Sequence, residues 1–475
     1  MIFKPLPHQP GAIQHIIDNK FCALYAGCGL GKTSMVLMAL EKIALTEEVY
    51  PVLVIGPLRV ARKVWDEETQ KWEELSHLKV SKIIGSSDER LSGLKVKADI
   101  YCINYENLPW LVSLLGDKWP YKTVIADEST RLKSFRGGLQ KSKLGKVFVR
   151  SGGGSRASAL AKVRPLLKRM VQLTGTPSPN GLKDLWGQLW FLDYGKRLGA
   201  TYGDFESRWF EVVNNSSGFG GVLIPRPGSE EAIHAAVSDI CYPIIASDWF
   251  DLEKPVVHTI LVDLPKPAMV KYKEMERQLF TAINGNEIEA MNAASKSMKC
   301  LQLANGAAYI DDESTRWATL HDEKLLALES IIEESGGSPI IVAYNFKSDL
   351  ARLQAWFPKG RVLKTVKDED DFKAGKIDLL FAHPESCGHG IDGFQKVCNI
   401  IVFFGLNWNL ESHDQIIERI GPVRQMQAKM NRSMFVYYIA AKNTVDELVL
   451  ERLSTKRSVQ DILQEAVKNF KEKVA

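Results

Sequence analysis

The chain has 475 residues, of which 45% are apolar and 25% charged, and its 61 basic and 57 acidic side chains leave a net charge of +4. This length corresponds to roughly three domains of about 150 residues, so one small module is excluded. The composition is that of a folded globular protein and excludes collagen, coiled coil and a largely disordered chain. The small net charge leaves open whether basic residues gather in a patch that binds a polyanion.

The first residues and the cysteine pattern indicate a cytoplasmic protein. The opening sequence MIFKPLPHQP has prolines where a signal peptide has an unbroken apolar stretch, and no apolar run approaches the ~18 residues that cross a bilayer. The seven cysteines are scattered without a CxxC pair, and the histidines lack the spacing of metal ligands. We therefore expect no membrane partner, no disulfide framework and no structural metal.

Two blocks of the chain alternate short apolar runs with helix-like segments, as in parallel sheets that are covered by helices. In the first block the predicted strands are residues 21–25, 52–55, 99–103, 123–126 and 170–173, and the predicted helices are 34–43 and 60–72. In the second block the predicted strands are 340–343, 377–381, 400–404 and 434–439, and the predicted helices are 348–357 and 414–419. We therefore predict an α/β fold with two lobes.

The regions outside these blocks have a different pattern. Residues from 190 to about 322 are polar and rich in aromatic side chains, with a Gly/Ser/Asn loop at 214–221 and a predicted helix at 271–280. An apolar stripe after Thr444 predicts that the chain is helical to its end. The predicted organisation is a first lobe (1–190), a mainly helical insert (191–322), a second lobe (323–443) and a C-terminal helical brace (444–475).

A glycine-rich segment, AGCGLGKT at 26–33, follows a predicted strand and opens a predicted helix. In that context glycines let the chain turn tightly, so that backbone N–H groups and the start of the helix face a chain of phosphates. Lys32 is expected to reach the outer phosphates, and the Thr33 hydroxyl is expected to bind Mg²⁺. The residues predicted to bind a nucleotide here are Gly27, Gly29, Gly31, Lys32 and Thr33.

Two acidic residues, Asp127 and Glu128, directly follow the predicted strand at 123–126. Ligands bind at the carboxyl edge of such sheets, so both carboxylates are expected near the phosphates. Asp127 is the predicted Mg²⁺ partner, and Glu128 is predicted to polarise the attacking water. Taken alone, either motif has a simpler alternative, which is a glycine turn without a ligand or a solvated acidic turn.

Together these segments resemble the superfamily 2 helicase-like ATPases, and more closely their Swi/Snf-like branch of DNA translocases. The first motif of that branch has the form AxxGxGKT, which accounts for Ala26. The resemblance covers most of the chain apart from about 199–239. Three further segments of the first lobe carry it: LTGTPSPN at 173–180 is similar to the third motif, INYE at 103–106 to another family block, and PLPHQ at 5–9 to the segment whose glutamine, here Gln9, reads adenine.

The second lobe carries the most specific part of the resemblance. Trp408 and Asn409, followed by Gln415, Arg419 and Gln425, reproduce the spacing of the WN and QxxxRxxRxGQ elements of the family. The segments IIVAYNF at 340–346, SCGHGID at 386–392 and TVDELVLERL at 444–453 resemble its fourth motif, its fifth motif and its closing helix.

The chain also departs from the family at two motifs. The second motif reads Asp-Glu-Ser-Thr instead of Asp-Glu-Ala-His, and Pro422 stands where the sixth motif has its second arginine, with Arg424 two positions later. The resemblance implies two RecA-like lobes that bind ATP and Mg²⁺ between them. It implies catalytic roles for Gln415 and for Arg419, which would contact the γ-phosphate, and it makes Arg424 the candidate arginine finger.

Thirteen basic residues and no acidic residue lie between Ser129 and Lys183. A positive track of this kind binds phosphate backbones, with an affinity that falls as salt rises. The loop at 137–156 is a candidate flexible basic finger on duplex DNA, and the alternative is a disordered, solvated loop. The thirteen residues are Arg131, Lys133, Arg136, Lys141, Lys143, Lys146, Arg150, Arg156, Lys162, Arg164, Lys168, Arg169 and Lys183. The predicted DNA contacts, from this track and from the family motifs, are Arg59, Asn104, Lys133, Lys141, Lys143, Arg156, Thr176, Asn345, Ser386 and Trp408.

The chain contains no zinc finger and no evident helix-turn-helix pattern, so we expect recognition of the DNA backbone and shape. Trp186, Trp190, Trp209 and Trp249 could stack on bases but are more typical of a core. We predict a DNA-dependent ATPase that moves along duplex DNA without sequence specificity, in a compact form more typical of bacterial or phage proteins. Two alternatives stay open: a helicase that separates DNA or RNA strands, and a clamp that binds ATP without hydrolysing it.

Overall fold

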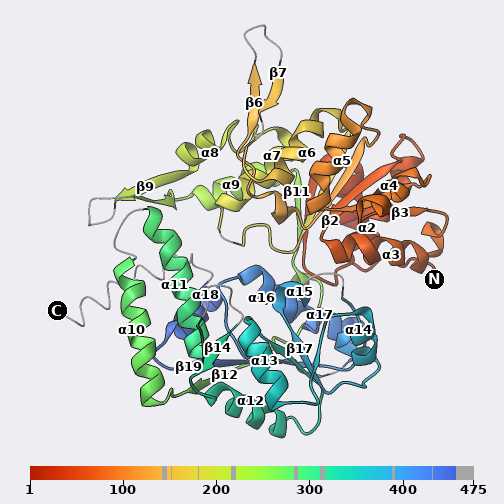
Figure 1. Cartoon of the computed structure of the whole chain (residues 1–475). Coiled ribbons are helices and arrows are strands. Elements are labelled where there is room, and N and C mark those ends of the chain that lie inside the picture. The colour runs from red at the N-terminus through yellow and green to blue at the C-terminus, as the bar shows by residue number, and fades with distance from the viewer. Residues whose placement is uncertain are drawn as a thin grey trace. The chain divides into compact units, whose positions relative to one another are not determined.

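The computed structural model describes residues 1–455 apart from residues 142–146, 151, 180, 215–220, 283–286, 311–315, 388–390 and 431. The chain forms two compact units, unit 1 (Met1–Asp251) and unit 2 (Leu252–Ala475). Each unit is built on a parallel β-sheet flanked by helices (Figure 1), which confirms the predicted α/β fold with two RecA-like lobes. No helix in the described parts of the chain has the length and apolar character that a membrane crossing requires.

The sheet of unit 1 has the strand order β11-β1-β8-β5-β2-β4-β3, and all neighbouring strands are parallel. The five strands predicted from apolar runs are the five inner ones, which are largely buried. The two edge strands were missed because β3 alternates buried with half-buried residues and β11 contains Pro243. The strands are β1 (Phe21–Ala26), β2 (Val52–Gly56), β3 (Val80–Ile83), β4 (Ile100–Asn104), β5 (Thr123–Asp127), β8 (Arg169–Thr174) and β11 (Cys241–Ile244).

The helices of unit 1 pack on this sheet through apolar side chains. In the helix that follows the glycine-rich segment, residues 34–40 are all buried, so this helix runs through the interior of the unit. The helices are α1 (Gln9–Asp18), α2 (Lys32–Ala44), α3 (Trp65–Lys71), α4 (Ser87–Lys95), α5 (Leu108–Leu115), α6 (Ser155–Val163), α7 (Lys183–Asp193), α8 (Tyr202–Trp209) and α9 (Ser229–Val237).

The sheet of unit 2 has the strand order β12-β19-β18-β15-β17-β16 and is also parallel. The four predicted strands again form its inner part, whereas the edge strands β12 and β16 were missed because few of their side chains are buried. The strands are β12 (Val256–Val262), β15 (Ile340–Ala343), β16 (Arg361–Val362), β17 (Leu379–Ala382), β18 (Ile400–Phe403) and β19 (Phe435–Ala441). The helices are α10 (Lys266–Ala282), α11 (Glu287–Asn305), α12 (Glu323–Glu334), α13 (Lys347–Trp356), α14 (Val366–Lys373), α15 (Pro384–Cys387), α16 (Leu410–Glu418), α17 (Pro422–Gln427) and α18 (Val445–Thr455).

The interval 191–322, which we expected to be a separate and mainly helical insert, is shared between the two units. Its residues up to Asp251 belong to unit 1 and the others to unit 2. It supplies β11 and β12, each of which extends one sheet, and the paired helices α10 and α11, of which α10 contains the predicted helix at 271–280 (Figure 1). It also contains the hairpins β9 (Phe210–Asn214) with β10 (Gly221–Pro225) and β13 (Ala307–Tyr309) with β14 (Trp317–Thr319). The predicted loop at 214–221 joins β9 to β10, and its residues 215–220 lie outside the described part of the chain.

A buried polar cluster fixes the start of α18, the described part of the predicted brace, while residues 456–475 lie outside the described part. Lys324 Nζ lies 2.7 Å from Asp446 Oδ2, and both side chains are fully buried. Lys324 also donates to Asn305 Oδ1 (2.8 Å), and Asn305 Nδ2 donates to Asp349 Oδ2 (3.0 Å). Desolvation offsets much of the attraction in such a pair, but the loss of one partner would leave an uncompensated buried charge.

Candidate functional site

Three neighbouring strands of unit 1 bring the predicted nucleotide-binding segments to one sheet edge. β8 lies between β1 and β5, with Leu173 opposite Leu24 on one side and opposite Asp127 on the other. The glycine-rich segment follows β1, the LTGTP segment continues β8, and Asp127 ends β5. Because parallel strands end at a common edge, the three segments meet there.

The glycine-rich segment turns sharply between β1 and α2. Gly29 and Gly31 have φ angles of 83° and 79°, in the left-handed region that glycine adopts without strain. A Cβ atom at Gly31 would collide with Gln9 Nε2, so glycine is also required here by the close approach of another side chain.

Lys32 is the first residue of α2 and folds back over the turn. Its Nζ donates hydrogen bonds to the backbone oxygens of Ala26 (2.6 Å) and Gly27 (3.2 Å). Thr33 follows and is half-buried. The ammonium group is thus held by neutral carbonyls next to a helix N-terminus, where an anion is also favoured.

The start of α1 packs against the same turn. Gln9 Oε1 accepts a hydrogen bond from the Leu6 N–H (2.9 Å), and Gln9 Nε2 donates to the Leu30 oxygen (3.4 Å). The fully buried His8 lies beside it, with Nε2 2.8 Å from the same Leu30 oxygen. Two consecutive side chains therefore support the turn, and the amide predicted to read adenine has partners within the chain.

Asp127 is almost completely buried at the end of β5, with 7% of its surface exposed. Trp65 Nε1 donates a hydrogen bond to Asp127 Oδ2 (3.2 Å), and the Tyr105 hydroxyl donates to its backbone oxygen (3.0 Å). Burial raises the pKa of the Asp127 carboxyl above its usual value, while the charge of Lys32 and the bond from Trp65 oppose the rise. A divalent cation would stabilise the ionised form that burial disfavours.

Glu128 turns the chain sharply after β5. It is a non-glycine residue with a φ angle of 57°, a left-handed conformation that costs ~1 kcal/mol or more. Its Oε2 lies 3.5 Å from the Thr174 hydroxyl that donates to it, and its backbone oxygen accepts from the Tyr105 hydroxyl (3.3 Å). Strained backbone of this kind persists where surrounding contacts impose it, often at functional sites.

The departure from the family at the second motif is accompanied by a link through Gln188. Ser129 Oγ donates a hydrogen bond to Gln188 Oε1 (3.0 Å), and Gln188 Nε2 donates to the Pro177 oxygen (2.7 Å). Gln188 lies on α7 and is fully buried. One amide therefore connects the residue after the two acids with the segment that follows β8.

These features fit a nucleotide with a magnesium ion. The glycine turn and helix start present N–H groups to phosphates, and Lys32 adds a positive charge above them. The oxygens of Thr33 and Asp127 are of the kind that Mg²⁺ prefers. Among the described residues, no group of three or more His, Cys, Asp or Glu side chains is arranged to hold a metal by itself.

In unit 2 the two predicted catalytic arginines contact the segment that resembles motif five. Arg419, directly after α16, is buried and donates from Nη1 to the Ile391 oxygen (3.0 Å). Arg424, on α17, is also buried and forms an ion pair with Asp392. The predicted catalytic Gln415 lies buried on α16. The structure thus brings both arginines to residues 391–392.

Two predicted DNA contacts of unit 2 follow neighbouring strands, since Asn345 comes after β15 and Trp408 after β18. Asn407 Nδ2 donates to Asn345 Oδ1 (2.8 Å). Asn345 Nδ2 and Trp408 Nε1 are buried donors without a hydrogen-bond partner in the described part of the chain. The third predicted contact, Ser386, is exposed on α15.

Two predicted DNA contacts of unit 1 also follow neighbouring strands. Arg59 comes after β2, and Asn104 ends β4, which pairs with β2. Asn104 Nδ2 donates to Glu106 Oε2 (2.8 Å), and Arg156 Nη2 lies 3.2 Å from Glu106 Oε1. Asn104 and Arg156, which are 52 residues apart in sequence, therefore share one carboxylate.

The other predicted contacts of unit 1 lie near the LTGTP segment and in a hairpin. Thr176 donates from its backbone N–H to Thr174 Oγ1 (3.1 Å), and Lys133 Nζ lies 3.5 Å from Asp184 Oδ2. Lys141 is in a strand, but its side chain and the whole of Lys143 lie outside the described part of the chain.

The basic track is shorter than the sequence predicted. Arg164 and Arg169 are each only 3% exposed, so their inclusion in a surface track was wrong. Arg164 donates to the backbone oxygens of Phe191 and Leu192 (3.1 Å for the latter), and Arg169 donates to the Ile16 oxygen (2.6 Å). Both guanidinium groups satisfy carbonyls at helix ends inside the unit, a role that their sequence neighbours do not reveal.

Residues 137–156, predicted to be a flexible finger or a disordered loop, contain a β-hairpin. β6 (Gly138–Lys141) pairs in antiparallel fashion with β7 (Val147–Arg150), and a bridge between Phe135 and Gly153 continues the pairing. Phe135 is fully buried against Trp190 and neighbouring rings, which anchors the base of the hairpin. The hairpin stands out from the rest of unit 1 (Figure 1), and its residues 142–146 lie outside the described part of the chain.

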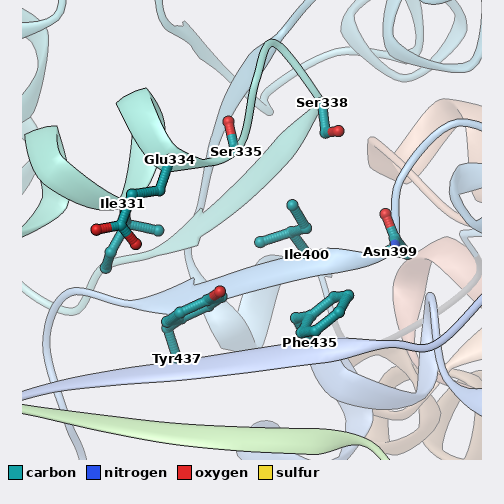
Figure 2. Close-up of a pocket in the computed structure, with 8 residues that line it drawn as sticks. All are labelled: Ile331, Glu334, Ser335, Ser338, Asn399, Ile400, Phe435 and Tyr437. Atoms are coloured by element: carbon teal, nitrogen blue, oxygen red, sulfur yellow. The ribbon is translucent and has the colours of Figure 1, made fainter.

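Unit 2 also contains a cavity of about 240 Å³ (Figure 2), and none of the predicted site residues lines it. Asn399 and Ile400 line it at the amino end of β18, and Phe435 lines it at the amino end of β19. The predicted residues of unit 2 follow the carboxyl ends of the strands, so the cavity opens at the opposite edge of the sheet. We therefore do not assign it to the candidate site.

Several residues that build the site had no assignment from the sequence. Trp65 contacts Asp127, which is 62 residues away in sequence, and Gln188 contacts Ser129, which is 59 residues away. No local sequence pattern identifies either residue. Tyr105 lies within the INYE segment, so that segment was the only signal that could have found it.

Comparison with known proteins shows which family this chain resembles. Residues 18–310 match the family described as SNF2-related domain. The protein p41 of Acyrthosiphon pisum secondary endosymbiont phage 1 is 48% identical over 470 residues, which cover 98% of this chain and 99% of the phage protein. The ISWI chromatin-remodeling complex ATPase ISW2 of Saccharomyces cerevisiae is 22% identical over 94% of this chain but only 39% of its own length. The solved Sulfolobus solfataricus SWI2/SNF2 ATPase core in complex with dsDNA is 20% identical, covers 96% of this chain and 93% of its own, and has a TM-score of 0.42.

Proposed function

The chain belongs to the SNF2-related family, and from this premise we propose that it is an ATP-dependent motor that moves along duplex DNA. ATP would be hydrolysed to ADP and phosphate, and duplex DNA would stimulate the reaction. The meeting of Lys32, Asp127 and Glu128 at one sheet edge carries the proposal, because phosphoryl transfer needs these charges in one place. The likeness to a yeast remodelling ATPase supports ATP as the nucleotide.

The residues of unit 1 divide the chemical work. Lys32 would exchange its two carbonyl partners for the outer phosphates, and Glu128 would orient the attacking water and accept its proton. Thr33 and Asp127 would hold Mg²⁺, which when bound neutralises negative charge on the phosphates. Gln9 would read the base once its amide releases its partners.

We assign Arg419 and Arg424 of unit 2 to charge compensation at the γ-phosphate. Both arginines contact residues 391–392, so a change in that segment would move both side chains together. Gln415, on α16, would assist them. The ion pair with Asp392 would have to open before Arg424 acts.

Each unit would hold the DNA backbone separately. In unit 1 the proposed contacts are Arg59, Asn104, Lys133, Lys141, Lys143, Arg156 and Thr176, and in unit 2 they are Asn345, Ser386 and Trp408. The hairpin, whose sequence contains Lys141, Lys143, Lys146 and Arg150, supports the assignment for unit 1. A nucleotide cycle that tightens one grip while the other relaxes would advance the protein along duplex DNA.

The test is the rate of phosphate release without polymer and with single-stranded DNA, duplex DNA or RNA, each at two salt concentrations. We expect the largest stimulation with duplex DNA, and a decrease of that stimulation as salt rises. Displacement of a triplex-forming strand without separation of a forked duplex would support translocation. Separation of the fork would favour a helicase, and nucleotide binding without turnover would favour a clamp.

A further inference from the structure

The structure separates one tryptophan from the others that the sequence analysis considered together. Trp186, Trp190 and Trp209 are buried in the core of unit 1, whereas Trp249 is 43% exposed. Among the Phe, Tyr and Trp side chains of unit 1 that the structure describes, no other is exposed to this degree. A tryptophan with this much exposed surface offers part of its ring to a ligand, and its position in the unit decides which ligand it could contact.

Trp249 lies next to the residues that support the glycine turn. Its ring centroid is 6.3 Å from that of His8, and the ring of the half-buried Phe250 meets His8 at 5.4 Å in an edge-to-face arrangement. His8 in turn contacts the Leu30 oxygen, which Gln9 also contacts. Residues 249 and 250 thus contact the glycine turn indirectly, through the buried imidazole of His8.

The local backbone keeps this arrangement in place. A 3-10 turn, η7 (Ala246–Asp248), precedes Trp249, and the N–H groups of Trp249 and Phe250 both donate to the Ala246 oxygen (3.2 and 3.0 Å). Phe250 packs on His8 as the anchor, and the neighbouring indole keeps an open surface.

We propose that Trp249 stacks on the base of the bound nucleotide. This inference rests on the proposed ATP site and adds a positioning residue to it. Lys32 and the glycine turn would hold the phosphates, Gln9 would bond the edge of the base, and the indole would cover its face. Stacking favours any base, because every base has a π face, so Trp249 contributes affinity and Gln9 contributes the choice of adenine.

The same assignment places a nucleotide contact close to the end of unit 1. Trp249 lies two residues before Asp251, after which unit 2 begins. A base that contacts Trp249 would therefore contact the segment that leads into unit 2.

The experiment measures the dissociation constants of Mg²⁺-ATP, Mg²⁺-GTP and Mg²⁺-tripolyphosphate by calorimetry for the full chain. We expect Trp249→Ala to weaken ATP and GTP about tenfold each and to leave tripolyphosphate, which has no base, unchanged. Trp249→Phe should keep most of the affinity. Trp356→Ala is the matched control, because Trp356 is 37% exposed on α13 of unit 2 and should have no effect.

The outcomes separate this inference from the proposed function. Equal loss of ATP and tripolyphosphate would mean that Trp249 only supports the turn, and unchanged binding of all three ligands would mean that its face serves another partner; either result overturns the inference. A wild-type chain that binds ATP in this way but releases no phosphate with DNA would overturn the motor and leave the stacking intact.

Discussion

The carboxyl edges of the two sheets carry positive charge in different ways. In unit 1 the hydrogen bonds of Lys32 go to two neutral backbone oxygens, and the acids nearby are held by Trp65 and Thr174. In unit 2 Arg424 is buried and paired with the carboxylate of Asp392. A cation whose partners are neutral carbonyls can exchange them for an anionic ligand at little cost in free energy. A cation in an ion pair must first lose its carboxylate partner.

This difference suggests that the two units control different steps. The groups of unit 1 that we propose to bind phosphates already lie together at one sheet edge, so we expect this unit to determine nucleotide affinity. Unit 2 must rearrange the contacts of residues 391–392 before its arginines can act, so we expect it to determine the rate of hydrolysis. Lys32→Ala and Arg424→Ala test this division, and two further predictions concern the stability of unit 2 and the hairpin of unit 1.

Lys32→Ala should have the largest effect, because it removes the positive charge that unit 1 offers to the outer phosphates. We expect phosphate release to fall ~1,000-fold or more and ATP binding to weaken at the same time. Steady-state kinetics and calorimetry would measure both changes. Lys42→Ala is the control, since Lys42 is exposed at the other end of α2. Intact ATP binding in Lys32→Ala would contradict the role that we give to unit 1.

Arg424→Ala should lower the rate of phosphate release ~100-fold and leave the dissociation constant of ATP unchanged, because the arginine would act only on the transition state. Asp392→Asn is the companion variant, which removes the ion-pair partner but keeps Arg424, and should keep most of the turnover. Single-turnover measurements of both variants would separate chemistry from binding. Wild-type turnover in Arg424→Ala would mean that the finger is another residue.

The contribution of His321 to the stability of unit 2 should fall in mild acid. Burial lowers the pKa of this imidazole from 6.5 to about 4, and its Nε2 lies 3.0 Å from the Leu303 oxygen. Below pH 6.5 the unfolded chain binds a proton that the folded unit does not, until the pH reaches the folded pKa near 4. The loss between pH 7 and pH 5 is about 2 kcal/mol.

Urea unfolding at pH 7 and pH 5 would give the free energy of unfolding of the wild type and of His321→Gln. The difference between the two proteins should be about 2 kcal/mol smaller at pH 5 than at pH 7 if His321 accounts for the loss. The variant is needed because burial raises the pKa of Asp349 in the same unit to about 6, which stabilises the fold as the pH falls through this range. A difference that is independent of pH would show that His321 does not titrate in this way.

Charge reversal on the hairpin should have the smallest effect. Lys141→Glu with Arg150→Glu should weaken duplex DNA about tenfold and reduce the salt slope by about one unit for each phosphate that the hairpin no longer neutralises, while ATP binding stays the same. Lys364→Glu with Lys367→Glu changes the charge equally at exposed positions of unit 2 and is the control. An unchanged affinity and slope would make the hairpin a solvated projection.

The sequence predicted the inner strands of both sheets because they are apolar runs between helical patterns. The edge strands β3, β11, β12 and β16 were missed because solvent on one side permits polar residues and even Pro243. The glycine turn and the two acids follow the ends of inner strands, so their meeting could be predicted. Gln188 and Trp249 could not, because their contacts depend on how helix α7 and the end of unit 1 pack against residues far away in sequence.

Because β8 lies between β1 and β5, the hydrogen-bonded sheet fixes the distance between these two strands. Adjacent strands lie about 4.8 Å apart, so β1 and β5 are separated by about 9.6 Å. That spacing leaves the width of one strand, β8, between the strand that leads into the glycine turn and the strand that ends in Asp127. Because hydrogen bonds keep the spacing between strands constant, any movement of unit 1 toward a bound ligand must come from the loops beyond the strand ends. Such loops are the parts that differ most between proteins that share a fold.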